Sequence, residues 1–553
     1  MKNKGAVESA LTRKQCLENY VGGSIPNKLS SVMKQKNSRT KNSILNVLAS
    51  LSGQLLSIVM KFITRTVFIY VLGKEYLGIN GLFSDILSML SLTELGIDTA
   101  INYQLYKPLA EHDTKRVRVL MKFYKQAYQV IGITIFVLGL CLIPLLPHLI
   151  RDYDSLAQLG INAAMVFTLY LLQSVSSYMF LAYRSAVMKA NQRKYILDLA
   201  DYAVTITANI VQILILLLLH SFILYTASLI FFNALKNLVN AIIAEHDTPE
   251  FFEKEEDSLS KEEVVGLFKD CGALFVYKLN GVVLKATDNL VLSTFIGLAI
   301  VGMYSNYLLC YSTIKSTLNQ VYNAVKASMG NLFATGSIEK KYSFFRIMNF
   351  LTIVLYGTAS IGVAVCLNEL ILVWVGADYV IAQPFPLLIG VEILFVGLKT
   401  NLNQIRNISG VFRQMWFRPI LGVIINLGVS IALVQVCGIY GVIIGTITAD
   451  FLTNFMVDPR VIHKYSFENY RPVSEYYKTN LGYILLLAVI YVADFWMCDA
   501  FLTGRGWLSV IIHIFIVITT VPTIYLIVYW KTSECRYFVA LIKKVAEKQK
   551  KVF

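Results

Sequence analysis

The sequence predicts an all-α integral membrane protein with about fourteen transmembrane helices. Hydrophobic residues make up 56% of the 553 residues, and only 15% are charged, whereas soluble proteins carry roughly 25% charged residues. The mean hydropathy is +0.59. The apolar residues come in stretches of about 20 residues, the length that a helix needs to cross roughly 30 Å of hydrocarbon. We therefore expect a bundle of membrane-spanning helices.

The predicted spans follow one another with short polar loops between them. Two pairs, in 197–244 and 416–460, run together with almost no linker, so each pair could be counted differently. The spans lie near 46–72, 78–103, 127–146, 157–182, 197–219, 222–244, 266–296, 299–325, 346–375, 385–407, 416–436, 439–460, 478–498 and 506–530.

The distribution of basic residues predicts the orientation of these spans. The formal net charge is +15, and the charges lie between the apolar stretches, which argues against a nucleic-acid-binding face. Every second loop is rich in lysine and arginine, as are both termini, whereas the alternate loops carry only Lys74, Arg151 and Arg505. By the positive-inside rule, we expect both termini to be cytosolic.

The polar segments divide the chain into two halves and three flanking pieces. An acidic segment between the sixth and seventh spans makes a natural linker between two six-helix lobes, although it could equally be an ordinary solvated loop. The expected divisions are a basic tail at 1–42, a first lobe at 43–245, the acidic linker at 246–263, a second lobe at 264–465, two further helices within 466–530 and a basic tail at 531–553.

The two lobes show an internal repeat at an offset of 224 residues. This offset aligns Gly73 with Gly297 and Gly78 with Gly302, and in both places a helix ends, turns at glycine and is followed by another helix. We therefore predict two pseudo-symmetric lobes around a central cavity, as in many transporters.

Basic residues inside the predicted spans are candidates for binding an anionic substrate, because a charge in hydrocarbon normally faces a wet cavity or a partner. Lys61 lies about twelve residues, or roughly 18 Å, before the turn at Gly73, and the repeat aligns it with Lys285. Arg65 is one turn beyond Lys61, and Lys278 is nearer the cytosolic side. The alternative is local pairing, for example of Lys285 with Asp288.

Acidic residues inside the spans are candidates for gating or ion coupling. Glu94 and Asp98 share one face of the second span, Asp288 lies in the seventh span and Glu392 in the tenth. Each of them could instead form an ion pair within the helix bundle; Glu392, for example, shares a face with Lys399.

Polar and aromatic residues after the second glycine turn suit a sugar-bearing ligand. Asn306 and Tyr307 are the candidates, with Tyr304 beside them and Asn401 and Asn403 on the tenth span. The same residue types also form ordinary hydrogen bonds between membrane helices.

The motifs of several enzyme classes are missing from the sequence. It contains no Walker A loop, no H-E-x-x-H, no G-x-S-x-G and no C-x-x-C, and its histidines and cysteines are scattered. We therefore predict that the protein has no cofactor, no metal site and no catalytic residues.

Five short motifs resemble those of bacterial polysaccharide-unit flippases, the transporters of O-antigen and capsule repeat units. They are YLGINGLF at 76–83, ELGI at 94–97, LYKPLA at 105–110, TDN at 287–289 and GMYSNY at 302–307. These flippases belong to the multidrug/oligosaccharidyl-lipid/polysaccharide exporter superfamily, and the resemblance covers about 43–530.

The resemblance implies a twelve-helix core in two lobes, two additional helices, and alternating access of the central cavity to the two membrane faces. The implied cargo is an oligosaccharide on undecaprenyl pyrophosphate, whose anionic head would meet cations that match Lys61, Arg65 and Lys285. Membrane lipids, and a polysaccharide polymerase and glycosyltransferases of the same pathway, would be its partners. Two alternatives remain open: a cation-coupled multidrug exporter of the same superfamily, and a membrane enzyme such as a polymerase or ligase.

Overall fold

The computed structural model describes residues 53, 55–91, 97–158, 160–191, 193–253, 255, 257–266, 286–411, 413–415, 417–501 and 506–540. Within these ranges the regular structure is entirely helical, and no residue is in a β-strand. The predicted fold class is therefore confirmed.

The helices of the first half run from the helix Leu55–Leu72 to α11. They are Leu55–Leu72, α3 (Lys74–Leu90), α4 (Ile97–Glu111), α5 (Thr114–Leu142), α6 (Leu146–Leu149), α7 (Tyr153–Gln158), α8 (Ala163–Met179), α9 (Ser185–Ala190), α10 (Lys194–Leu219) and α11 (Phe222–Asp247).

The helices of the second half begin with a helical segment at 286–295. They continue with α13 (Leu298–Thr335), α14 (Ile338–Val375), α15 (Phe385–Ser409), α16 (Arg418–Cys437), α17 (Ile439–Asp450), α18 (Asp458–Tyr465), α19 (Val473–Phe501) and α20 (Trp507–Val528).

Ten helices in the described ranges are long and apolar enough to span a membrane, or eleven if the bent pair α8 and α9 is one span. The 38-residue α13 is not among them, because polar side chains such as Asn306, Lys315 and Asn319 lower its hydropathy. A total of fourteen spans stays a prediction, since parts of the expected second and seventh spans lie outside the described residues.

Several helices extend beyond the predicted spans. α5 begins at Thr114, where the Asp113 side chain accepts a hydrogen bond from the Arg116 amide. α14 begins at Ile338, where Ser337 is the N-cap and accepts from the Lys340 amide. Such capping satisfies amides that the first helical turn leaves unpaired. Hydropathy detects only the apolar part of each helix, so the sequence underestimated these lengths.

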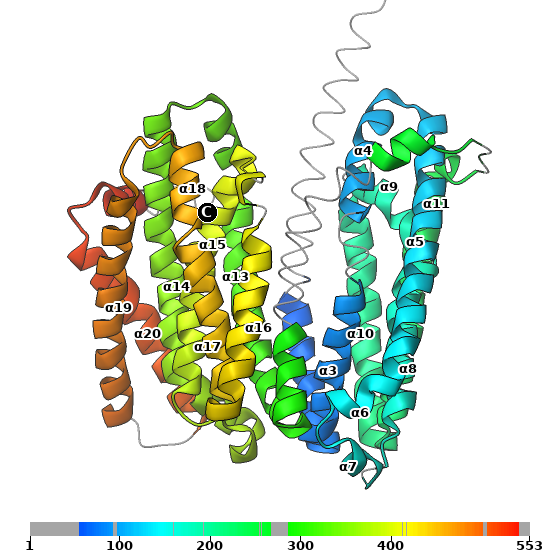
Figure 1. Ribbon diagram of the computed structural model, residues 1–553, viewed down its shortest axis with the longest axis horizontal. Coiled ribbons are helices and arrows are strands. Elements are labelled where there is room, and N and C mark those ends of the chain that lie inside the picture. Colours follow the sequence, from blue (N-terminus) through cyan, green and yellow to red (C-terminus); the bar gives the residue numbers. More distant parts are fainter. Residues whose placement is uncertain are drawn as a thin grey trace, which may run out of the picture.

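The helices gather into two groups that meet at α3 and α13. Figure 1 shows α4, α5, α8 and α11 in one group and α14 to α20 in the other, with α19 at its outer edge. Close contacts join α3 to α13, and α19 and α20 both pack against α14. The last two helices are thus an addition to the second group.

The contact between α3 and α13 is reciprocal, as expected for a pseudo-two-fold axis. A Cβ added to Gly78 would lie 2.1 Å from the carbonyl oxygen of Leu298, and one added to Gly302 would lie 2.1 Å from that of Lys74. The offset of 224 that relates Gly78 to Gly302 also relates Lys74 to Leu298, so each half makes the same contact with the other. The turns also match, because Gly73 and Gly297 both have positive φ, of 91° and 134°.

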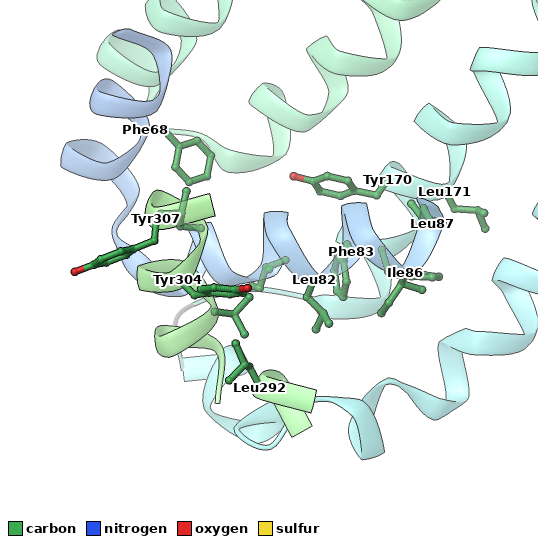
Figure 2. Packing of buried hydrophobic residues seen from close by; sticks show 14 of the residues in the cluster. Phe68, Leu82, Phe83, Ile86, Leu87, Tyr170, Leu171, Leu292, Tyr304 and Tyr307 are labelled. Carbon is green, nitrogen blue, oxygen red and sulfur yellow. The ribbon is translucent and has the colours of Figure 1, made fainter. Parts of the chain in front are cut away.

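Residues on the outside of the bundle are apolar, whereas many polar residues lie inside. On α10, Leu214, Leu217 and Leu218 are exposed, but Gln212 is buried. Inside the first half, the rings of Phe83 and Phe167 pack edge to face. Figure 2 shows this aromatic core, with Phe83 and Tyr170 close together. A surface of this kind is stable only in lipid, so the protein is a multi-pass membrane protein.

Candidate substrate cavity

A cavity of about 730 Å³ lies between the two halves. From the first half it is lined by Lys61, Thr64, Arg65, Phe68, Asn80, Gly81, Ser84, Asp85, Asn209, Gln212 and Tyr225. From the second half it is lined by Asp288, Asn289, Tyr304, Ser305, Leu308, Leu309, Tyr311, Ser312, Lys315, Ser316, Asn319, Glu392, Val396, Lys399, Thr446 and Asp450.

Arg65 lies where the cavity meets the contact between the halves. Its Nε donates a hydrogen bond of 2.9 Å to Oδ1 of Asn306, and its Nη2 donates to Oγ of Ser305. Both partners are on α13 and are uncharged. Among the residues that the structure describes, Arg65 has no carboxylate within ion-pair distance, so its positive charge is stabilised by neutral dipoles.

Lys61 lies one turn before Arg65 and also lines the cavity. Its side chain is exposed, and it forms no ion pair within the described part of the chain. Two cations on one helix therefore face the same cavity without an ion-pair partner among the described residues, an arrangement that favours binding of an anion.

Neutral hydrogen-bonding groups surround these cations on the first-half wall. Thr64 donates to Oδ1 of Asn209 at 2.8 Å, and the Tyr170 hydroxyl donates to Oδ1 of Asn80 at 2.7 Å. Gln212 is 6% exposed and lines the cavity, yet makes no hydrogen bond with a described residue. The sequence analysis missed Asn80, Asn209 and Gln212. Each of them is a polar residue within an apolar span, a rare combination that marks candidate site residues. We used this criterion only for charged residues and therefore missed these amides.

The second-half wall carries acids and tyrosines. Asp288 is 8% exposed and lies beside Asn426 and Thr446, while Glu392 lies beside the Tyr311 hydroxyl. Neither acid forms an ion pair with a residue in the described ranges. These two predicted coupling candidates therefore line the same cavity as Lys61 and Arg65.

Other charged groups in the cavity have partners. Nζ of Lys399 lies 3.0 Å from Oδ1 of Asp450, so Lys399 pairs with α17 rather than with its neighbour Glu392. Asp85 accepts a hydrogen bond of 2.5 Å from Asn289 across the contact between the halves. Lys315, which the sequence analysis did not single out although it lies within a predicted span, places its ammonium 5.5 Å from the centroid of the Tyr311 ring.

Two predicted sugar contacts lie beside the cavity rather than in it. Tyr307 is fully buried, donates to Asn368 at 2.6 Å and accepts from the Ile381 amide at 2.9 Å. Asn306 is also fully buried and reaches the cavity only through Arg65. Figure 2 shows the hydroxyls of Tyr304 and Tyr307 pointing in opposite directions. Of the two tyrosines, only Tyr304 lines the cavity.

The remaining candidates cannot be placed in the cavity. Lys285, Lys278 and Glu94 lie outside the described residues, and of Asp98 only the helical backbone in α4 is described. Asn401 and Asn403 do not line the cavity. Within the described ranges, no group of three or more histidine, cysteine, aspartate or glutamate residues is placed to hold a metal ion.

No protein-family model and no curated protein matches this sequence. Solved structures do match the fold. The lipid II flippase MurJ in an inward closed conformation aligns with a TM-score of 0.62 and 14% identity over 87% of this chain and 99% of that chain. A multidrug resistance MATE family transporter of the MOP superfamily, in an inward-facing conformation, aligns with a TM-score of 0.57 and 12% identity over 77% of this chain and 99% of its own. The chain therefore has the same overall fold as these flippase and transporter structures.

Proposed function

We propose that the protein moves an undecaprenyl-pyrophosphate-linked oligosaccharide from the cytosolic to the outer leaflet of the bacterial cytoplasmic membrane. The observation that carries this proposal is the placement of Lys61 and Arg65 in one cavity without a carboxylate partner among the described residues. A pyrophosphate can supply the missing negative charge. Sugar and pyrophosphate cannot cross hydrocarbon, so a polar cavity must carry them while the polyprenyl chain stays in lipid.

The internal repeat supports the same proposal. The reciprocal contact of Gly78 and Gly302 follows the offset that aligns Lys61 with Lys285. Lys285 lies outside the described residues, and the repeat in the sequence predicts it as the counterpart of Lys61, so that cations from both lobes would bind one anionic group. Alternating access then follows from rocking one lobe against the other about the contact of α3 with α13.

Flipping in proteoliposomes tests the proposal. Arg65→Ala should lower the rate of translocation of an undecaprenyl-pyrophosphate-linked oligosaccharide about tenfold to a hundredfold, because hydrogen bonds to charged groups contribute about 1.5–3 kcal/mol. Combined Lys61→Ala and Lys285→Ala should abolish it, and with it surface polysaccharide in cells. Arg460→Ala, which removes an exposed guanidinium outside the cavity, is the matched control. Normal translocation by both cavity variants would refute the head-group site.

A cation-coupled multidrug exporter is the second candidate, because Asp288 and Glu392 line the same cavity without ion pairs to described residues. For that function, Glu392→Gln and Asp288→Asn should abolish drug efflux driven by a cation gradient, while Arg65→Ala should have little effect. For a pyrophosphate-bearing cargo, Arg65→Ala should instead lower transport more than Glu392→Gln or Asp288→Asn.

A further inference from the structure

The wall of the first half carries two carboxamides with hydrogen-bonding groups that no described residue uses. Gln212 has a carboxamide with two donors and one acceptor, lies more than nine-tenths buried, and bonds to no residue that the structure describes. The carboxamide nitrogen of Asn80 is also unused within the described ranges, because only its oxygen accepts from Tyr170. A polar group buried in a membrane protein without a partner is costly, so these groups are suited to a polar ligand.

These two amides lie at the depth of Arg65. Arg65 is eight residues before the turn at Gly73, about 12 Å at 1.5 Å per residue, and Asn80 is seven residues after it, about 10 Å. Gln212 is seven residues before the end of α10, about 10 Å from it. Phe222, which follows that end, packs against Tyr76 beside Gly73, with ring centroids 5.1 Å apart, so the two turns are at the same level.

Contacts between α10 and the helix Leu55–Leu72 also bring Gln212 near Arg65. Asn209, one turn before Gln212 on α10, accepts a hydrogen bond from Thr64, the neighbour of Arg65. Lys61 lies one turn farther from the glycine turns than Arg65. The cavity thus presents a lysine nearer its middle and, one turn closer to the contact of α3 with α13, an arginine at the same depth as two neutral amides.

We propose that Gln212, together with Asn80, is a specificity-determining site that binds the sugar directly attached to the pyrophosphate. This inference rests on the proposed function. It adds that the wall of the first half binds the saccharide. Amides that both donate and accept match vicinal sugar hydroxyls and acetamido groups, whereas a phosphate oxygen only accepts. The pyrophosphate lies at Lys61 and Arg65, and the first sugar lies beside Arg65, against the wall of the first half.

The test is binding to the purified full-length protein in lipid nanodiscs. The two probes are undecaprenyl pyrophosphate and undecaprenyl pyrophosphate carrying one N-acetylhexosamine. Gln212→Leu should weaken binding of the sugar-bearing probe about threefold to tenfold, the effect of one or two neutral hydrogen bonds, and leave binding of the bare pyrophosphate unchanged. Arg65→Ala should weaken binding of both probes. Thr207→Val, which removes an exposed hydroxyl from the same helix, is the control, and Gln212→Ala is the second variant.

The outcomes separate this inference from the proposed function. If the Gln212 variants weaken both probes equally, or neither, while Arg65→Ala weakens both, the saccharide site is wrong and the pyrophosphate site stands. If the unaltered protein binds neither probe, or Arg65→Ala changes nothing, the proposed function fails and the saccharide site fails with it.

Discussion

Arginines inside the helix bundle have two different kinds of partner. Arg406 and Arg418 are both almost fully buried and both approach Oδ2 of Asp458, at 3.7 Å and 3.0 Å. Arg65 instead has an amide and a hydroxyl as partners and borders a cavity. The first arrangement holds helices α15, α16 and α18 together, whereas the second leaves charge available for a ligand.

Asp458→Asn should strongly destabilise the protein, because it removes the carboxylate that two buried arginines share. Loss of one member of a buried ion pair costs about 3–5 kcal/mol. The measurement is thermal unfolding in detergent. Asp494→Asn is the control, since Asp494 is also buried but accepts its hydrogen bond from the neutral Thr520 hydroxyl. An Asp458 variant no less stable than the Asp494 variant would contradict this account.

At the scale of elements, the acidic linker packs against the first half rather than standing free in solvent. Lys115 pairs with Asp257 at 2.6 Å, Arg116 with Glu263 at 2.6 Å, and Arg118 with Glu253 at 2.5 Å. The three basic residues lie in the first turns of α5. Three ion pairs thus attach the linker to the first half.

These contacts should depend on pH and salt. Lys115 lowers the pKa of Asp257 through a hydrogen bond, and hydrogen bonds from Ser260 and Arg116 lower the pKa of Glu263. A lowered pKa means that the attachment is complete above the ordinary carboxylate values, near pH 4, and is lost as the pH falls through the lowered values. At neutral pH, high salt should loosen it by screening.

Limited proteolysis of the linker measures this attachment. Cleavage within 253–263 should be slow at neutral pH in low salt, and faster in 1 M salt or after Lys115→Glu. Lys340→Glu, which changes an exposed lysine on α14, should leave cleavage unchanged. Cleavage that does not respond to salt or to Lys115→Glu would show that the ion pairs do not hold the linker.

The contact of α3 with α13 should not tolerate a side chain at either glycine. Gly302→Ala would place a methyl group 2.1 Å from the carbonyl oxygen of Lys74, so the two helices must separate. We expect lower thermal stability and stronger labelling of a cysteine introduced at Ser305. Gly330→Ala, on the same helix with no atom within 4 Å, should be neutral or stabilising by up to about 1 kcal/mol. Equal behaviour of the two variants would argue against the tight contact.

At the scale of the whole molecule, the two halves meet along one end of the cavity. Besides α3 and α13, the Trp374 indole donates to Thr66 at 2.7 Å, and Arg151 donates to the carbonyl of Phe295 at 2.6 Å. All of these contacts lie near the glycine turns. A transporter that alternates must separate them in each cycle, so a covalent bond across this end should stop transport.

A disulfide between Gly81→Cys and Ser305→Cys tests this expectation. A Cβ built on Gly81 lies 4.0 Å from Cβ of Ser305, within the range that disulfides need, about 3.5–4.5 Å. In a chain whose native cysteines are replaced, oxidation of the double variant should abolish transport, and reduction should restore it. Each single variant controls for the loss of glycine or of the Arg65 hydrogen bond. Transport that continues with the disulfide formed would exclude rocking about this contact.

The amino-acid sequence alone was enough to predict that the protein lies in a membrane, that its fold is all-α and that its two halves are related. Apolar stretches of membrane length predict helices in lipid, because that pattern depends only on residues close together in the chain. The glycine offset predicts two related lobes, because it compares two short segments without any need to know how they pack. Local pattern also predicted that Lys61, Arg65, Asp288 and Glu392 lie within membrane-spanning helices, where a charge is rarely without a role.

Only the tertiary structure decided which of these residues share a cavity. From the sequence, Tyr307 and Gln212 are equally good candidates for substrate binding, because both are polar residues in apolar spans. In the structure, the Tyr307 hydroxyl forms hydrogen bonds with Asn368 and Ile381, while Gln212 lines the cavity. Likewise Lys399 pairs with Asp450 rather than with Glu392 on its own helix. The physical reason is that the direction of a side chain depends on how distant helices cross, and spacing along one helix does not contain that information.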